Sequence, residues 1–361
     1  MNLAVFSAKP YDREFLSLAN TTLSSASGSQ PHTITFHDFA LSEQTVSLAH
    51  GADAVCVFVN DVLSEPVLRA LRDEGVRAIL LRCAGYNNID LAAAEALGLF
   101  VANVPSYSPE AVAEFALALI QTLNRKTHRA YNRVREGNFN LDGLMGRTLH
   151  GKTVGVVGTG KIGIAFAKIA RGFGCRLLAY DPFPGEAFKQ FGDYVTLEEL
   201  LAQSDFVSLH CPLTEGTTHI INGRTLGLMK EGAMLVNTSR GGLVHTESVI
   251  AALKSRHLGG LALDVYEAEG GLFYHDHSAE IIQDDELMRL MTFPNVLVCG
   301  HQAFFTEEAL TEIAECTIRN LGDFSNRIPC KNSLVKYGPA PVAPELIRQK
   351  LIRRDSLPVR I

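Results

Sequence analysis

The 361-residue sequence lacks several features that would place it in a specialised class of protein. No apolar run approaches the roughly 20 residues that a membrane-spanning helix needs. Its 33 basic residues are fewer than its 39 acidic ones, which argues against nucleic acid or an anionic membrane surface as the main partner. Its seven cysteines include no CxxC pair, so we interpret them as reduced core thiols in a reducing compartment.

The N-terminal stretch MNLAVFSAKPYD has neither a basic n-region nor a sustained apolar segment. We therefore expect no signal peptide, a cytoplasmic location and no membrane partner. His275, Asp276 and His277 could suggest metal ligands, but no third ligand motif accompanies them. We expect a solvated loop there and no bound metal.

The chain is longer than one compact core usually holds, so two domains are expected. Short apolar runs alternate with longer helical patterns, which is typical of parallel sheets connected by crossover helices. Ser108 is a plausible N-cap of one long helix, 108–137, at which the chain changes domain. The predicted strands are 3–6, 33–36, 54–59, 76–82 and 100–104, then 153–157, 176–180, 206–210, 234–237, 260–264 and 296–299.

We assign residues 1–105 and 301–335 to a substrate-binding domain. Residues 106–300 form the expected dinucleotide-binding domain, and 336–361 form a C-terminal extension without an assigned function.

A glycine motif lies between a predicted strand and a predicted helix. In GTGKIG, Gly158, Gly160 and Gly163 have the GxGxxG spacing, with Lys161 and Ile162 between the last two. The first glycine permits a tight turn, the second lets the backbone approach a pyrophosphate, and the third lets the helix pack close to the strand. The helix N-terminus then favours the phosphates, so the motif predicts a dinucleotide site.

Asp181 follows the next predicted strand, eighteen residues after Gly163. A carboxylate there can accept hydrogen bonds from both ribose hydroxyls and repels a 2′-phosphate, which predicts NAD rather than NADP. The alternative is a turn residue before Pro182.

Three polar residues closely follow the ends of later strands. They are Arg240, Glu269 and His301, and ligands of open α/β sheets gather at such strand ends. A guanidinium can bind the carboxylate and carbonyl of a 2-oxo acid, and an imidazole can exchange a proton near neutral pH. A carboxylate bonded to that imidazole fixes its tautomer and favours the imidazolium. These three residues are the candidate catalytic set.

At these residues the chain resembles the D-isomer-specific 2-hydroxyacid dehydrogenases, and most of all their fermentative D-lactate branch. The segments GTGKIG, SLHCPLTEGTTHIIN, MKEGAMLVNTSRGGLV, LDVYEAE and NVLVCGHQAF match family motifs in order and spacing. Gly270 stands where many relatives have proline, which favours the lactate branch. The resemblance covers nearly the whole chain, roughly 2–335.

The resemblance implies two doubly wound parallel-sheet lobes, a flavodoxin-like catalytic lobe and a Rossmann lobe that binds NAD. Phe58 and Phe304 are candidates for the wall of the side-chain pocket, although core packing is at least as plausible for each. The segment 108–137 resembles the family's dimerisation arm, so we expect a homodimer. Further substrate-binding positions implied by the resemblance are Gly85, Tyr86 and Tyr107, and further cofactor-binding positions are Cys211, Pro212, Thr217, Thr238, Ser239 and Asp264.

The expected activity is reduction of pyruvate to D-lactate with NADH, by reversible hydride transfer at C2. Two alternatives stay open: a dehydrogenase for a bulkier 2-oxo acid, and an NAD-sensing binding protein similar to transcriptional corepressors. Pocket size would decide the first, and the turnover rate would decide the second.

Overall fold

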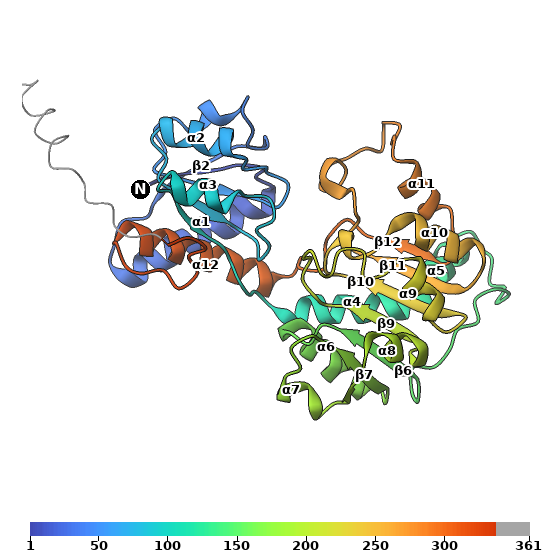
Figure 1. Ribbon diagram of the computed structural model, residues 1–361. Coiled ribbons are helices and arrows are strands. Elements are labelled where there is room, and N and C mark those ends of the chain that lie inside the picture. Colours follow the sequence, from blue (N-terminus) through green and yellow to red (C-terminus); the bar gives the residue numbers. More distant parts are fainter. Residues whose placement is uncertain (337–361) are drawn as a thin grey trace, which may run out of the picture. The chain divides into compact units, whose positions relative to one another are not determined.

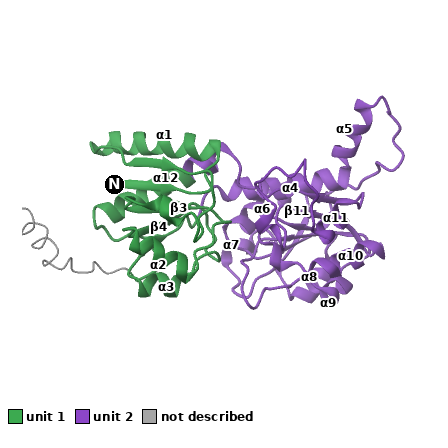
Figure 2. Ribbon diagram, turned by 90° about the horizontal axis from the view of Figure 1, so that it is seen from above, with its two compact units in different colours: residues 1–105, 313–361 green, residues 106–312 purple. Residues whose placement is uncertain are grey.

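The computed structural model describes residues 1–336, which fold into two compact units (Figure 2). The first unit consists of residues 1–105 and 313–336, and the second consists of residues 106–312. Apart from Lys336, the expected C-terminal extension lies outside the described residues. Helix α12 (Glu307–Ser325) contains the boundary at 312/313. Among residues 1–336, no helix is both long and apolar enough to cross a bilayer.

The first unit is built on a five-stranded, all-parallel sheet with the order β2-β1-β3-β4-β5. This order is that of flavodoxin-like folds. The strands β3 and β4 are buried along their whole length. The elements are β1 (Asn2–Val5), α1 (Pro10–Ser27), β2 (Thr33–Phe36), the 3-10 turn η1 (Val46–Ala49), β3 (Ala54–Val57), α2 (Glu65–Asp73), β4 (Ala78–Leu81), α3 (Leu91–Ala96) and β5 (Phe100–Ala102).

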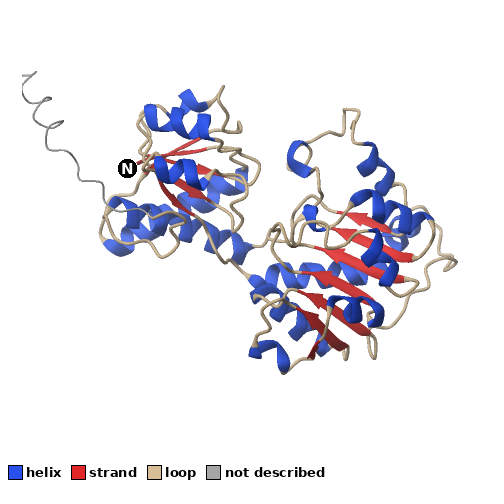
Figure 3. Cartoon of the chain, viewed as in Figure 1, coloured by secondary structure: helices blue, strands red, loops and turns tan. Residues whose placement is uncertain are grey.

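The second unit is built on a seven-stranded, all-parallel sheet with the order β12-β11-β10-β9-β6-β7-β8. Helices alternate with its strands along the chain (Figures 1 and 3). The elements are α4 (Pro109–Arg125), α5 (Thr127–Arg135), β6 (Thr153–Val157), α6 (Lys161–Gly172), β7 (Arg176–Tyr180), α7 (Glu186–Lys189), β8 (Asp193–Tyr194), α8 (Leu197–Gln203), β9 (Phe206–Leu209), α9 (Gly223–Leu228), β10 (Ala233–Asn237), η2 (Gly241–Leu243), α10 (Thr246–Lys254), β11 (Leu258–Leu263), η3 (Glu269–Gly271), α11 (Asp285–Met291) and β12 (Val296–Val298).

The central strands of the second sheet are apolar on both faces. Every residue of β6, β9 and β10 is buried, as expected for a parallel sheet covered on both sides. Along β10, Leu235 belongs to one hydrophobic core and Val236 to another, because successive side chains of a strand point to opposite faces. Continuous apolar runs therefore identified these strands correctly.

The structure confirms the predicted fold class and changes two of its details. Strand β8 was not predicted, because two residues at a sheet edge give no apolar run. The single helix expected from Ser108 is two helices. Ser108 accepts a hydrogen bond from the amide of Ala111, but Lys126 has a left-handed φ of 53°, which ends α4 before α5 begins.

Candidate active site

The glycine-rich turn lies between β6 and α6, where the strand order of the second sheet reverses. Gly158 has a φ of 93°, and a Cβ there would lie 2.6 Å from the backbone nitrogen of Cys211. A Cβ on Gly163 would lie 2.1 Å from the carbonyl oxygen of Gly158. Gly160 has open space around it and is the N-cap of α6, with no side chain capping the helix. Two glycines thus make the turn possible, and the third leaves the helix N-terminus accessible to an anion.

Lys161 and Ile162 form the first turn of α6. Lys161 is exposed, whereas Ile162 is half-buried and packs against the core between α6 and the sheet.

Asp181 follows the C-terminal end of β7 and is connected to the glycine-rich turn. Its Oδ2 accepts hydrogen bonds from the backbone and hydroxyl of Thr159, at 2.7 and 2.9 Å, and its Oδ1 accepts one from the amide of Phe183. The hydroxyls of Thr159 and Tyr194 lie 2.8 Å apart. A carboxylate has about four acceptor positions, so Asp181 keeps capacity for a ribose hydroxyl. Thr159 and Tyr194 were not predicted, although Thr159 lies inside the glycine motif.

The remaining predicted cofactor positions lie after β9, β10 and β11. Burial raises the pKa of Cys211 to about 11, so its thiol stays protonated near neutral pH. Pro212 is exposed, and its carbonyl accepts a 2.6 Å hydrogen bond from the hydroxyl of Thr217. The hydroxyl of Ser239 donates to the carbonyl of Cys211, also at 2.6 Å. These side chains hold neighbouring loops together.

Thr238 follows β10 directly, and its buried Oγ1 has no hydrogen-bond partner among residues 1–336. A buried hydroxyl without a partner costs free energy, and a ligand atom that bonds to it would remove this cost. Together with the glycine-rich turn and Asp181, this orphaned hydroxyl fits a bound dinucleotide.

Asp264 follows β11, and burial raises the pKa of its carboxyl group. Hydrogen bonds from the amides of Gln302 and Ala303 lower this pKa but do not outweigh burial.

Arg240, Glu269 and His301 follow β10, β11 and β12, three neighbouring parallel strands. Their strand ends therefore lie at the same edge of the sheet. Asn237 fixes the segment of Arg240, donating to the Arg240 carbonyl at 2.8 Å and accepting from the amide of Ser239 at 3.0 Å. One nitrogen of the guanidinium donates to the carbonyl of Ser239. Since a guanidinium has five N–H donors, others remain for a ligand.

The imidazole of His301 is paired with Glu269. Its Nδ1 lies 2.9 Å from Oε1 of Glu269, and the two side chains are 14% and 19% exposed. The other carboxylate oxygen of Glu269 accepts a 2.9 Å hydrogen bond from the amide of Tyr266. An acceptor at Nδ1 fixes the proton on that nitrogen, which leaves the Nε2 side for exchange with a ligand.

The backbone of His301 is in the left-handed region, with a φ of 54°. This conformation is uncommon for a residue other than glycine. The amide of His301 donates to the carbonyl of Asp264 at 2.7 Å, and the Asp264 carboxylate accepts from the amides of Gln302 and Ala303. Asp264 therefore holds the turn on both sides of the imidazole.

Aromatic rings surround the same imidazole. The ring of Phe304 packs edge-on against His301 and Tyr107, with centroid distances of 6.5 and 6.4 Å. Tyr274 lies 6.0 Å from the imidazole centroid and donates a 3.0 Å hydrogen bond to the His301 carbonyl. Tyr274 was not predicted, because it lies in a loop without a motif.

Gly85, Tyr86 and Phe58 belong to the first unit. The ring of Phe58 is buried, and its centroid lies 4.8 Å from the central carbon of the Arg82 guanidinium. This arrangement corresponds to the core-packing alternative for Phe58. The carbonyl of Gly85 accepts a hydrogen bond from the Cys83 thiol, and Tyr86 is exposed. The substrate-binding roles of these residues stay predictions.

Among residues 1–336, no group of three or more His, Cys, Asp or Glu side chains could hold a metal ion. His277 is instead paired with Glu280, its Nδ1 lying 2.8 Å from the carboxylate.

Comparison with known proteins is consistent with this site. The sequence model described as "D-isomer specific 2-hydroxyacid dehydrogenase, NAD binding domain" matches residues 117–303. The chain is 71% identical over 338 residues to 2-hydroxyacid dehydrogenase A of Aspergillus oryzae, covering 94% of this chain and 96% of that protein. It is 68% identical over 336 residues to D-lactate dehydrogenase kk1H of Curvularia clavata, covering 93% and 96%. The apo-structure of D-lactate dehydrogenase from Escherichia coli superimposes with a TM-score of 0.84 at 48% identity, covering 93% and 100%.

Proposed function

Because this chain belongs to the D-isomer specific 2-hydroxyacid dehydrogenases and is an NAD-dependent enzyme, we propose that its reaction is the reversible reduction of pyruvate to D-lactate. The single observation that carries the proposal is the pairing of His301 with Glu269 at the strand edge that also bears Arg240. Similar proteins named D-lactate dehydrogenases support pyruvate as the substrate.

Arg240 is the proposed anchor of the oxo acid. Its guanidinium stays charged at any working pH and can donate hydrogen bonds to the substrate carboxylate and carbonyl oxygen together. Polarising the carbonyl makes C2 more electrophilic, and binding both groups orients C2. Thr238, the glycine-rich turn and Asp181 are the proposed contacts of the cofactor.

His301 is the proposed proton donor. When bound, NADH supplies the hydride that C2 receives. The substrate oxygen then needs a proton, which the imidazolium gives from Nε2 while Nδ1 stays hydrogen-bonded to Glu269. The carboxylate of Glu269 stabilises the imidazolium before the transfer and keeps the ring in place afterwards. In lactate oxidation the same nitrogen accepts the proton.

The test is NADH oxidation with a panel of 2-oxo acids from glyoxylate through pyruvate to phenylpyruvate, with chiral analysis of the product. We expect pyruvate to give the highest kcat/KM and the product to be D-lactate. A clear preference for phenylpyruvate would favour the alternative of a bulkier substrate. Turnover far below ordinary enzyme rates with every acid would contradict the proposal and favour a binding protein.

We further propose a homodimer, formed through α5 and the segment 138–148 that follows it. No residue of α5 is buried, and the arm exposes the large apolar side chains of Phe139, Leu141 and Met145. An exposed apolar patch of this kind is typical of an interface. Sedimentation analysis should give twice the chain mass, and the double variant Leu141→Glu, Met145→Glu should be monomeric. A wild-type monomer would contradict this proposal.

A cytoplasmic location is also proposed, because all seven cysteines are free and five of them are buried. Cell fractionation of the native host tests it, and recovery outside the cytoplasm would contradict it.

A further inference from the structure

We propose that Glu267 is a positioning residue, whose carboxylate fixes the turn that carries Glu269 relative to the segment that carries Arg240. The inference rests on the proposed roles of these two residues and concerns a side chain to which no role has been given. Glu267 lies two residues before Glu269, in the turn that follows β11.

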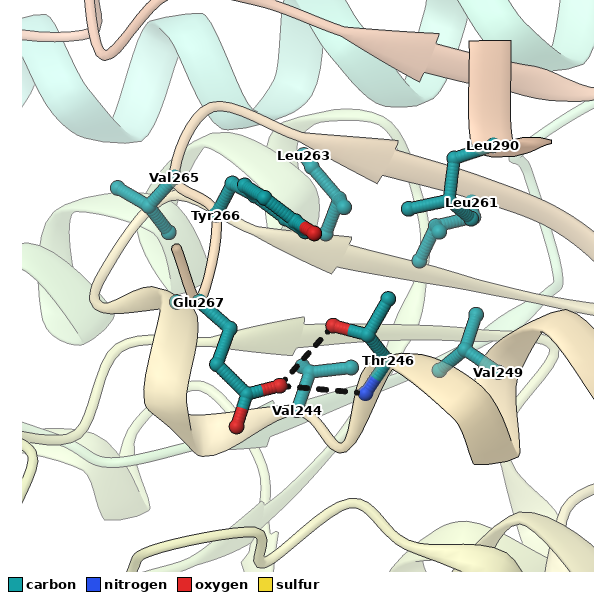
Figure 4. A pocket seen from close by; sticks show the side chains of 10 residues that line it. Val244, Thr246, Val249, Leu261, Leu263, Val265, Tyr266, Glu267 and Leu290 are labelled. Carbon is teal, nitrogen blue, oxygen red and sulfur yellow. Dashed lines mark hydrogen bonds between the residues drawn. The ribbon is translucent and has the colours of Figure 1, made fainter. Parts of the chain in front are cut away.

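The two carboxylate oxygens of Glu267 bind different segments of the second unit. Oε1 is paired with Nε2 of His219, in the loop after β9. Oε2 accepts hydrogen bonds from the hydroxyl and the amide of Thr246, at 3.0 and 3.4 Å (Figure 4). Thr246 is the first residue of α10, shortly after Arg240. One side chain thereby joins segments that follow three adjacent strands, β9, β10 and β11.

Backbone contacts strengthen the connection between the same segments. A Cβ on Gly241 would lie 2.1 Å from the carbonyl carbon and oxygen of Tyr266, so the residue after Arg240 lies directly against the turn of Glu269. The amide of His219 donates to the carbonyl of Gly242 at 2.9 Å. A shift of the turn would therefore move the Arg240 segment and Glu269 relative to each other.

Packing against this turn is incomplete on one side. A small cavity lies beside it, lined by the apolar side chains of β11, α10 and α11 (Figure 4). Tyr266 and Glu267 form one wall of this cavity. Tyr266 is buried in the hydrophobic core, so the turn is packed on part of its surface. The cavity removes some van der Waals contacts on its own side, whereas hydrogen bonds to a carboxylate are directional and strong. The bonds of Glu267 therefore add a directional restraint to the packing of the turn.

The charge of Glu267 is part of this restraint. Burial raises its pKa, but hydrogen bonds from His219 and Thr246 outweigh burial and hold the pKa below its usual value. Other carboxylates lie nearby: burial, together with the charges of Glu247, Asp284 and Glu267, raises the pKa of Glu286. The hydrogen bond between His219 and Glu267 stabilises the Glu267 carboxylate against this repulsion.

The test compares Glu267→Ala and Glu267→Gln with a matched control, Glu74→Ala. Glu74 forms the same kind of pair with His50, at 2.9 Å, in the first unit. We expect kcat of Glu267→Ala to fall between about tenfold and about a hundredfold, because small misplacements of reacting groups have effects of this size. NADH affinity should be unchanged. Glu267→Gln keeps one of the two acceptor oxygens and should lose only about threefold in kcat, and Glu74→Ala should match the wild type.

A second readout separates positioning from loss of folded protein. With NADH deuterated at the transferred position, the isotope effect on kcat should rise in Glu267→Ala, because a misaligned site slows the chemical step. A lower rate with an unchanged isotope effect would overturn the inference, as would activity equal to that of Glu74→Ala. If Glu267→Ala does not fold, Thr246→Val removes one of the same bonds and should raise the isotope effect with a smaller loss of rate; no rise would overturn the inference.

The assays use the 2-oxo acid that the wild type reduces fastest. If the wild type reduces none, the proposed function fails before any variant is compared. If the wild type turns over and Glu267→Ala behaves as the control, only the role of Glu267 fails.

Discussion

Two parts of the same sheet edge are built in different ways. At β6 and β7, the glycine-rich turn takes its shape from the absence of side chains at Gly158 and Gly163. At β10 to β12, by contrast, hydrogen bonds that side chains donate or accept hold Arg240, Glu269 and His301. The first part is therefore a matter of backbone space and the second a network of polar contacts. Substitutions should accordingly affect folding and cofactor binding at the first, and the rate of chemistry at the second.

The largest expected effect tests the polar network at its centre. His301→Ala should lower kcat by about a thousandfold, because the proposed proton donor is lost. NADH affinity, measured by the change in its fluorescence on binding, should stay within about twofold, because the glycine-rich turn is unaltered. Near-normal turnover would refute the role of His301, and a large loss of NADH affinity would show that the two parts of the edge are not separable.

A matched pair of glycine variants tests the other side of the comparison. Gly163→Ala should lower the free energy of unfolding by about 2 kcal/mol, because its Cβ meets the Gly158 carbonyl oxygen at 2.1 Å and the backbone must move. Gly160→Ala adds a methyl group in open space, so it should leave the free energy of unfolding unchanged. It should weaken the binding of NADH, because the second glycine lets the backbone approach the pyrophosphate. Urea unfolding and NADH titration measure both quantities. Equal stability of the two variants would remove the distinction between them.

The same contrast explains what the sequence could predict. The alternating pattern predicted both parallel sheets, because buried parallel strands are continuous apolar runs. Glycine spacing predicted the turn at Gly158, since only glycine satisfies its backbone. Arg240, Glu269 and His301 were predicted from strand ends and family spacing, and the structure brings Glu269 and His301 into contact.

The supporting side chains could not be predicted in this way. Thr159, Glu267 and Tyr274 contribute through their placement in the fold, and none belongs to a pattern with a fixed spacing. The break at Lys126 was missed because a left-handed residue other than glycine leaves no strong signal in the sequence. Side-chain networks that depend on tertiary contacts are thus the part of the site that needed the structure.

A buried histidine between the two parts makes stability depend on pH. Burial lowers the pKa of His210 to about 3, and its ring packs against Phe166 with Nε2 near the Ser208 hydroxyl. The unfolded chain binds this proton at its ordinary pKa, about 6.5. Stability is therefore fully present above that pH and is lost as the pH falls from there toward 3, by up to about 1.4 kcal/mol per pH unit. In His210→Gln, urea unfolding at pH 7.5 and 5.5 should show a smaller difference than in the wild type. An equal difference would contradict this assignment.

The smallest expected effect concerns Tyr274, at the edge of the polar network. Tyr274→Phe keeps the ring beside the imidazole and removes the hydrogen bond to the His301 carbonyl. A single bond of this kind contributes about 1 kcal/mol or less to a geometry that Asp264 and Glu269 also hold. We expect kcat to fall about threefold, with the KM for the oxo acid unchanged.

Tyr266→Phe is the comparison variant for this last prediction. Its hydroxyl donates to Asp284 at the other end of the same loop, and Asp284 caps α11 through the amide of Leu287. Removing this hydroxyl should lower the thermal stability and should lower kcat less than Tyr274→Phe does. The reason is that its bond holds the loop and the helix rather than the imidazole. If both tyrosine variants lower kcat equally, anchoring of the loop as a whole controls His301, and the contact from Tyr274 has no separate effect. If only Tyr274→Phe does, the polar network extends one side chain beyond Glu269 and Asp264, into a loop whose sequence gave no indication of it.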